Sequence, residues 1–430
     1  MKAPGTARAV GTLSLTAVLA ATIAVLALGL LQKAPCATGN WSDGRQYRRL
    51  CYTDLVPLYH TERMNTGRLP YLDPCPERAA ACDEYPVLTM YFMRLSGWLS
   101  GNSSGSFFVV NAALLAVLAV AAATFLYQMT STRALYFALA PTLLVYAFIN
   151  WDLLAIVLAT GATFTFFRGR DRATGILLGL GTAAKLYPAL LVLPFCQARW
   201  KNGEKRRAGE IAAWAVGAWA LTNVPFAVAA GESWATFFTL NSDRPPDYTS
   251  LWYAACHRIT DNTTCVWSPH LINGLSLVAF AAVAAVAWWA RRRRTPDFPR
   301  WTLAFALIVA FLLTNKVYSA QYSLWLLPWF ALALPNVRLF VAFEITDIAV
   351  FVTQFSWFGT LSRDQGVPGF DGFTGPSLGA LELALVARSL VLVACLVAWV
   401  RTRDEPAQPL RLESGGVAPP YRSRTASGTR

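Results

Sequence analysis

The strongest constraint on the fold of this chain is a series of apolar runs that are long enough to cross a lipid bilayer. A helix needs about 20 apolar residues to span roughly 30 Å of hydrocarbon, and the first such run covers residues 10–31. Only 14% of the residues are charged, against about a quarter in soluble proteins. We therefore expect an all-α polytopic membrane protein with about 10–12 transmembrane helices. The later runs are 107–127, 134–149, 153–167, 175–196, 211–230, 271–290, 301–314, 320–334, 339–357 and 378–400.

Two other interpretations of these features are less favoured. The first run could be a cleaved signal peptide, because Lys2 and Arg8 precede it, but it is longer than a typical signal and many further runs follow. Intrinsic disorder of the whole chain is excluded, because 16 Trp, 15 Tyr and 25 Phe supply abundant surface to bury.

Basic residues are concentrated in three connecting segments, which the positive-inside rule places in the cytoplasm. These segments are 168–172, 199–210 and 291–300. The connections 32–88, 231–269 and 358–376 together hold more acidic than basic residues, so we expect them on the outer side. Both termini are then cytoplasmic. The net charge of +13 reflects this orientation, and no nucleic-acid partner is expected.

The run 175–196 has basic segments at both ends, so it must enter and leave the membrane on the cytoplasmic side. Because it is too short for two full spans, we expect either a re-entrant pair broken near 185–188 or two short tilted helices. Irregular backbone at that depth requires surrounding protein or a water-filled cavity. The same reasoning applies to the runs 134–149 and 153–167. Each is short, and they meet at Asn150-Trp151-Asp152.

Six of the eight cysteines fall in the first two outer loops, 32–88 and 231–269, where disulfides can form. Six cysteines allow 15 pairings, and pairing between neighbours is our hypothesis. A zinc site is the competing reading, although no CxxC or close Cys/His pair occurs, and we expect no metal and no cofactor. The expected pairs are Cys36/Cys51, Cys75/Cys82 and Cys256/Cys265.

We interpret residues 1–400 as one integral membrane domain, with 32–88 and 231–269 as its first and second outer loops. Residues 401–430 are rich in Pro, Gly, Ser and Arg, which predicts a disordered cytoplasmic tail. The first outer loop is long and carries many charges and aromatic rings, and loops of this length are usually functional.

Short motifs occur in a fixed order from the first outer loop onward. They are Asp54 with Tyr59, Gly67 with Pro70-Tyr71, Tyr85-Pro86, Asn150-Trp151-Asp152, Lys185 with Tyr187-Pro188, and Ser319, Gln321-Tyr322, Trp325 and Pro328. In this order they resemble the motifs of the polyprenyl-phosphate-mannose-dependent mannosyltransferases of actinobacteria that form glycosyltransferase family 87. The resemblance implies a GT-C fold, in which a membrane bundle and a periplasmic cavity receive a lipid-linked sugar, and an acid of the first outer loop acts as base.

The chemistry of such a transfer needs few groups. A carboxylate takes the proton of the acceptor hydroxyl, and cations hold the departing phosphate. The resemblance places the base at Asp54, with Glu84 as the reserve acid. Asp54 could instead be a helix cap or an ion-pair partner, and Glu84 could cap the helix that begins at Tyr85.

Charges inside spans are costly and tend to be functional, so we expect Lys185, Arg244 and Lys316 to bind the donor phosphate. Lys185 could instead extend to a lipid headgroup, and Arg244 could pair with a neighbouring aspartate. We expect the substrate cavity to be lined by Tyr59, His60, Tyr71, Asp152, Gln321 and Tyr322.

We therefore predict an inverting membrane hexosyltransferase. Its donor would be a polyprenyl-phosphate sugar, with mannose as the expected hexose, and its acceptor an envelope glycolipid or glycan at the outer face of a bacterial plasma membrane. The alternative is a secondary transporter or flippase, which also combines many spans with intramembrane charges. We detect no internal duplication of the kind that transporters show, which favours the transferase.

Overall fold

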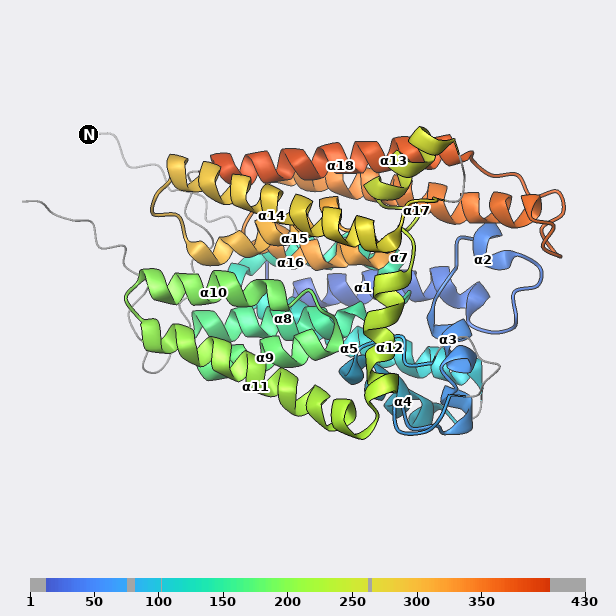
Figure 1. The fold of residues 1–430 in the computed structure, drawn as a ribbon, viewed down its shortest axis with the longest axis horizontal. Coiled ribbons are helices and arrows are strands. Elements are labelled where there is room, and N and C mark those ends of the chain that lie inside the picture. The colour runs from blue at the N-terminus through green and yellow to red at the C-terminus, as the bar shows by residue number, and fades with distance from the viewer. Residues whose placement is uncertain (1–12, 76–81, 102, 262–264, 403–430) are drawn as a thin grey trace, which may run out of the picture.

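The computed structural model describes residues 13–75, 82–101, 103–261 and 265–402 (Figure 1). Within these residues the chain forms helices and no strand. The predicted all-α bundle with a long first outer loop is therefore confirmed. The predicted tail, 401–430, lies outside the described residues apart from its first two.

Six helices are long and apolar enough to cross a membrane within the described ranges. Shorter helices run beside them (Figure 1), and the total of about 10–12 crossings stays a prediction. The long helices are α1 (Leu15–Lys33), α5 (Ser104–Thr130), α11 (Lys205–Ala229), α14 (Pro269–Arg294), α17 (Val337–Asp364) and α18 (Leu378–Arg401). The shorter ones are α6 (Leu135–Ala138), α7 (Pro141–Tyr146), α8 (Asp152–Phe167), α9 (Asp171–Ala184), α10 (Ala189–Lys201), α15 (Leu303–Thr314) and α16 (Leu327–Leu332).

The loops at one end of the bundle contain helices of their own. Two of these lie in the first outer loop and two in the second, and one of the latter, α12, lies across the long helices rather than along them (Figure 1). They are α2 (Arg45–Arg48), α3 (Leu55–Thr61), α4 (Val87–Ser100), α12 (Gly231–Asp243) and α13 (Leu251–Thr260). Short 3₁₀ helices cover Ala34–Cys36, Met64–Thr66, Ser131–Ala134, Arg300–Thr302 and Ala320–Leu326.

Local sequence explains where several of the long helices begin. Ser14, Ser103 and Ser377 each accept a hydrogen bond from a backbone N–H in the first turn of α1, α5 and α18, which satisfies a donor that the helix leaves free. Close packing of α9 on α11 depends on small residues. A Cβ atom on Gly179 would lie 2.3 Å from the carbonyl oxygen of Ala215, so only glycine fits there.

The two ends of the bundle differ in chemistry. At one end, which we call the basic end, Asp171 pairs with Arg199 and Arg207, and Lys201 lies 3.0 Å from Asp297. These contacts bring the three basic connections together. At the opposite end, which we call the outer end after its predicted orientation, the structure joins Cys36–Cys51, Cys75–Cys82 and Cys256–Cys265.

The segment 171–201 is a pair of short helices, α9 and α10, separated by a break at 185–188. A similar break at 147–151 separates α7 from α8. Both breaks lie toward the outer end, where one meets α4 and the other the first outer loop: Thr89 of α4 donates a hydrogen bond to the carbonyl of Ala184, and Thr53 donates to that of Phe148. The fold thus brings the two breaks into one shared region at this end of the bundle.

Candidate functional site

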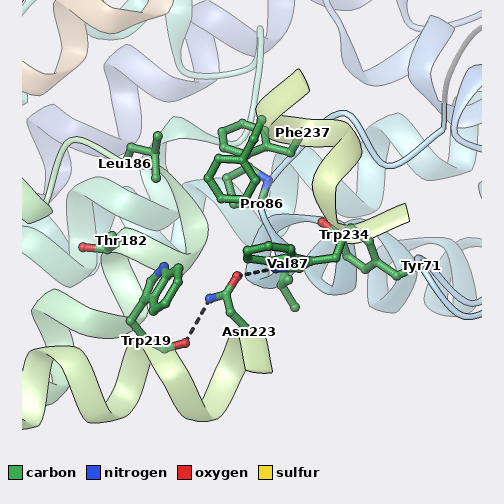
Figure 2. Close-up of a pocket in the computed structure, with 10 residues that line it drawn as sticks. Tyr71, Pro86, Val87, Thr182, Leu186, Trp219, Asn223, Trp234 and Phe237 are labelled. Carbon is green, nitrogen blue, oxygen red and sulfur yellow. Dashed lines mark hydrogen bonds between the residues drawn. The ribbon is translucent and has the colours of Figure 1, made fainter. Parts of the chain in front are cut away.

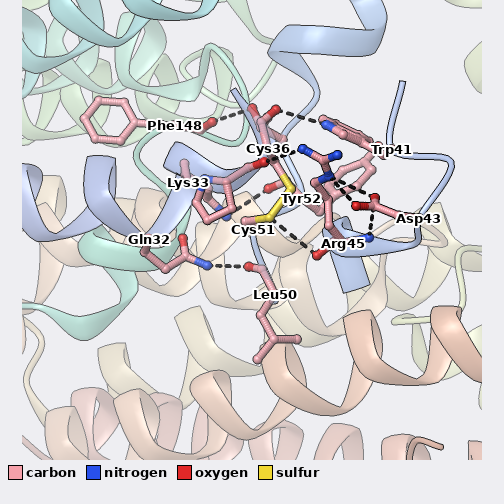
Figure 3. Close-up of a disulfide and its surroundings, with 12 residues drawn as sticks. Gln32, Lys33, Cys36, Trp41, Asp43, Arg45, Leu50, Cys51, Tyr52 and Phe148 are labelled. Carbon is pink, nitrogen blue, oxygen red and sulfur yellow. Dashed lines mark hydrogen bonds and ion pairs between the residues drawn. A yellow bond between two sulfur atoms is a disulfide. The ribbon is translucent and has the colours of Figure 1, made fainter. Parts of the chain in front are cut away.

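Asp54 occupies the residue just before α3, at the end of a segment that is held at several points. The Cys36–Cys51 disulfide links this segment to the end of α1, and the buried Lys33 donates a 2.8 Å hydrogen bond to the carbonyl of Tyr52 (Figure 3). On the other side, the backbone N–H of Asp54 donates to the carbonyl of Ile149 at 2.8 Å. The position of Asp54 is therefore fixed relative to both α1 and the α7–α8 break.

The carboxylate of Asp54 is partly buried and accepts hydrogen bonds from two neighbours. Asn150 Nδ2 lies 2.7 Å from Asp54 Oδ2 and 2.6 Å from the hydroxyl of Tyr85, and Tyr52 also hydrogen-bonds to the carboxylate. Burial raises the pKa of Asp54 above its usual value, although these hydrogen bonds and the nearby charge of Lys185 oppose the rise. A carboxylate with a raised pKa is a stronger base than an exposed one.

Asp152 and Lys185 form an ion pair beside this carboxylate. Asp152, the first residue of α8, is fully buried, and its Oδ2 lies 3.0 Å from Lys185 Nζ. Its Oδ1 accepts a 2.7 Å hydrogen bond from the indole N–H of Trp325. The Lys185 ammonium also lies 5.4 Å from the ring centre of Tyr85 and 5.3 Å from that of Tyr322. The pair thus brings together the α8 start, the α9–α10 break and the segment 320–326.

Aromatic rings surround the Lys185 ammonium. Trp325 stacks on Tyr187 with 4.4 Å between ring centres and on Tyr322 with 4.1 Å. Such a platform suits the face of a sugar or a cation. The predicted site residue Gln321 is buried in the same 3₁₀ helix.

Glu84 and Arg244 lie near Asp54, Asp152 and Lys185, which we call the cluster. Burial and the charge of Asp54 raise the pKa of Glu84 to about 7, while Arg244 and Lys185 favour its ionised form. Arg244, just after α12, has an exposed side chain. Lys316 is less available, since its ammonium donates to the carbonyls of Ser242 and Arg244 at 2.8 and 2.7 Å. Lys316 therefore supports the backbone that carries Arg244.

The other predicted residues of the first outer loop take different places. Tyr59 is buried against Phe107 and donates to the carbonyl of Gly101, and His60 is exposed with its ring against Tyr59. Tyr59 therefore faces the end of α4 and the start of α5. Tyr71 is closer to the cluster, because its hydroxyl donates to the carbonyl of Tyr85.

A pocket with aromatic walls adjoins the cluster (Figure 2). Two of its lining residues directly follow cluster residues: Leu186 follows Lys185, and Pro86 follows Tyr85. On the α11 and α12 side, Asn223 accepts a hydrogen bond from the indole N–H of Trp234 at 3.1 Å. The lining residues are Tyr71, Pro86, Val87, Thr182, Leu186, Trp219, Asn223, Trp234, Phe237 and Phe238.

Sequence reasoning did not assign a role to several residues of this region. Asn150 and Trp325 belong to motifs that the sequence displays, so their polar groups were available as a signal. Lys33 is a charged residue at the end of an apolar run. Lysines at the membrane interface occur in the same position, so the sequence did not single it out. The pocket walls of α11 and α12 carried no sequence signal beyond aromatic content.

If Asp54 is a base, the acid limb of the pH profile of kcat/KM will lie above the ordinary aspartate pKa of 3.8, because the group must lose its proton to act. We expect Asn150→Ala to move this limb to higher pH. The hydrogen bond from Asn150 favours the charged form, so its removal raises the pKa further. Rates measured from acid to neutral pH test this, and an unmoved limb would argue against Asp54 as the titrating group.

Comparison with known proteins identifies a related family. The model of glycosyltransferase family 87 matches residues 84–315, more than half of the chain. The matched range contains Glu84, Asp152, Lys185 and Arg244, whereas Asp54 lies before it. Among solved structures, the chain is similar to ArnT from Cupriavidus metallidurans in the apo state, with a TM-score of 0.43, 15% sequence identity, and coverage of 89% of this chain and 77% of that chain. No curated protein sequence matches the chain.

Proposed function

The chain belongs to glycosyltransferase family 87, and from that membership we propose that it transfers mannose from a polyprenyl-phosphate donor to an envelope glycolipid or glycan. Family membership confirms the expectation of a membrane glycosyltransferase. The donor, the sugar and the acceptor are the parts that we propose. The observation that carries them is the convergence of the Asp54 carboxylate and the Lys185 ammonium on the Asn150–Asp152 turn.

The cluster offers a place for each part of such a donor. We assign the phosphate to Lys185 and Arg244, because both are cations near Glu84 and Arg244 is exposed. The prenyl chain would leave along the aromatic pocket that begins at Leu186 and Pro86. The sugar would then lie against Tyr322, which stacks on the buried Trp325, between the cations and Asp54.

In the proposed reaction, an acceptor hydroxyl attacks the anomeric carbon and forms the new glycosidic bond. The bond from that carbon to the phosphate oxygen breaks, and polyprenyl phosphate leaves with the electron pair. Asp54 takes the hydroxyl proton, while Lys185 and Arg244 stabilise the charge on the phosphate. A single displacement on a β-linked donor gives an α-linked product, and it needs one carboxylate rather than the pair of a glycoside hydrolase.

We further propose that this reaction takes place at the outer face of a bacterial plasma membrane, with both chain termini in the cytoplasm. The basic connections and the disulfide-bearing loops lie at opposite ends of the bundle (Figure 1), as that orientation requires. The site then opens where a lipid-linked sugar would present its head group. Residues 1–400 would act as one domain, followed by a cytoplasmic tail.

The proposal is tested by incubating purified protein with farnesyl-phosphate β-mannose, labelled in the sugar, and lipids extracted from bacterial envelopes. We expect label in an α-mannosylated lipid and release of farnesyl phosphate. Vesicles that contain the reconstituted protein, with donor on one side only, distinguish a transferase from a flippase. Movement of intact donor across the membrane without sugar transfer would contradict the transferase and favour a flippase.

A further inference from the structure

Asp347 of α17 and Arg388 of α18 form an ion pair inside the helix bundle, away from the catalytic cluster. Arg388 Nη1 lies 3.1 Å from Asp347 Oδ1, and the two side chains are 1% and 0% exposed. Burying such a pair is costly, and replacing one by apolar residues of similar volume is often neutral or stabilising. Stability alone therefore gives a weak reason for these charges to be here.

The pair makes contacts with three segments that are distant in sequence. Asp347 accepts hydrogen bonds from Ser323 at 2.6 Å and from Thr142 at 3.3 Å. Arg388 donates to the carbonyl of Thr249 at 3.3 Å, and its guanidinium lies 3.7 Å from the ring centre of Tyr318. The two charges therefore join α17 and α18 to α7, to the 315–326 region and to the loop before α13.

Two of these segments carry residues of the proposed donor site. Ser323 directly follows Tyr322 and lies two residues before Trp325, which are the rings beside Lys185. Ser323 also hydrogen-bonds to the hydroxyl of Tyr318 at 3.0 Å. The pair thus fixes the aromatic platform through one short hydrogen bond.

The contact of Arg388 with Thr249 connects the ion pair to the segment that carries Arg244, one of the proposed phosphate ligands. The Thr249 hydroxyl donates to the carbonyl of Tyr318 at 2.7 Å, and the backbone N–H of Asp247 donates to the carbonyl of Lys316 at 2.8 Å. Lys316 in turn holds the carbonyl of Arg244. A chain of hydrogen bonds through the 247–249 and 316–318 segments therefore connects Arg388 with the backbone of Arg244.

The third segment leads to the Asn150–Asp152 turn. Thr142 lies on α7, whose end is followed by the break that carries Asn150. Glu344, one turn before Asp347 on α17, accepts hydrogen bonds from the backbone N–H and the hydroxyl of Thr142 at 2.8 and 2.7 Å. The start of α7 is thus held by two acidic side chains of one helix.

We propose that Asp347 and Arg388 are positioning residues for the donor. Their paired charges hold the rings of Tyr322 and Trp325, and the backbone of Arg244, in the positions that receive the sugar phosphate. This inference rests on the proposed function. A displacement of about 1 Å in a substrate-positioning group can lower catalysis by about 10²-fold, so residues far from the reacting atoms can control donor use.

The test replaces both charges at once, as Asp347→Leu with Arg388→Met, so that no unpaired charge is left in the bundle. We expect the double variant to fold with a Tm close to that of the wild type, while its kcat/KM for farnesyl-phosphate β-mannose falls by about 10²-fold. The loss should fall mainly on the donor KM, and the acceptor KM should stay unchanged. A purely structural role would lower Tm or the active fraction and leave the donor KM as it is.

Two further variants keep the test decisive. Ser323→Ala removes one hydrogen bond to Asp347 and leaves the ion pair in place, so it should raise the donor KM even if the double variant fails to fold. Arg258→Gln is the matched control, because it removes the contact of the exposed Arg258 of α13 with Glu382 of α18 and touches neither Asp347 nor Arg388, and we expect wild-type kinetics. A wild-type donor KM in Ser323→Ala and in a folded double variant would overturn the inference. Absence of transfer by the wild type would overturn the proposed function itself.

Discussion

Replacement of Asp54 by asparagine is expected to lower kcat for mannose transfer by about 10²- to 10⁴-fold, the usual contribution of a positioned acid or base. The donor KM should change little, because the phosphate is assigned to Lys185 and Arg244. Asparagine keeps the shape of the side chain and can still accept the hydrogen bond from Asn150, which is 2.7 Å long in the wild type. The fold should therefore survive, and a scanning measurement of Tm on purified protein checks this.

The control for this variant is Asp43→Asn. Asp43 also lies in the first outer loop, but it is exposed and pairs with Arg45 at 2.8 Å. We expect wild-type kcat and KM, since a surface ion pair contributes little. Equal kcat for Asp54→Asn and the wild type would remove Asp54 as the base, and Glu84, whose pKa is about 7, would become the next carboxylate to examine.

Replacement of Lys185 by methionine is expected to lower kcat/KM for the donor by about 10²- to 10³-fold, which is typical for the loss of one group that stabilises developing negative charge. Both the donor KM and kcat should respond, because in the proposed reaction the ammonium contacts the phosphate before and during bond cleavage. The measurement is release of farnesyl phosphate from farnesyl-phosphate β-mannose at several donor concentrations.

Two comparisons separate this effect from damage to the fold. Lys185→Met leaves the buried Asp152 without its cation, which is destabilising, so Lys185→Met with Asp152→Asn should restore Tm without restoring kcat/KM. Lys201→Met is the matched control, because Lys201 ends α10 at the basic end and pairs with Asp297 at 3.0 Å. Wild-type donor kinetics in Lys185→Met would show that this ammonium serves the fold alone.

Much of the architecture could be predicted from the sequence because it follows from local patterns. Apolar runs identified the helices, and the basic connections separated the two ends. The break between α9 and α10 was predicted from the charges that flank 175–196, since a chain that leaves and returns on one side must turn. Neighbouring cysteines are joined in the structure, as short loops favour.

The candidate site was harder to predict because it depends on contacts between distant segments. The sequence singled out Lys316 for the donor phosphate, yet its ammonium holds the carbonyls of Ser242 and Arg244, which only the folded chain reveals. The acids Glu344 and Asp347 are buried in the bundle, and their contacts with Thr142 and Ser323 link them to the site. Tyr59 resembled a cavity residue by its spacing from Asp54, but the α3 helix turns it toward Phe107.

The central claim is that Asp54 and Lys185 lie on either side of a lipid-linked sugar. The most direct test is a cryo-EM structure of Asp54→Asn bound to farnesyl-phosphate β-mannose and an acceptor lipid, a combination that the variant should bind without turning over. We expect the donor phosphate on Lys185 and Arg244, the prenyl chain between Leu186 and Phe237, and an acceptor hydroxyl within hydrogen-bond distance of residue 54. Density for the sugar phosphate elsewhere in the bundle, with this cluster unchanged, would contradict the account.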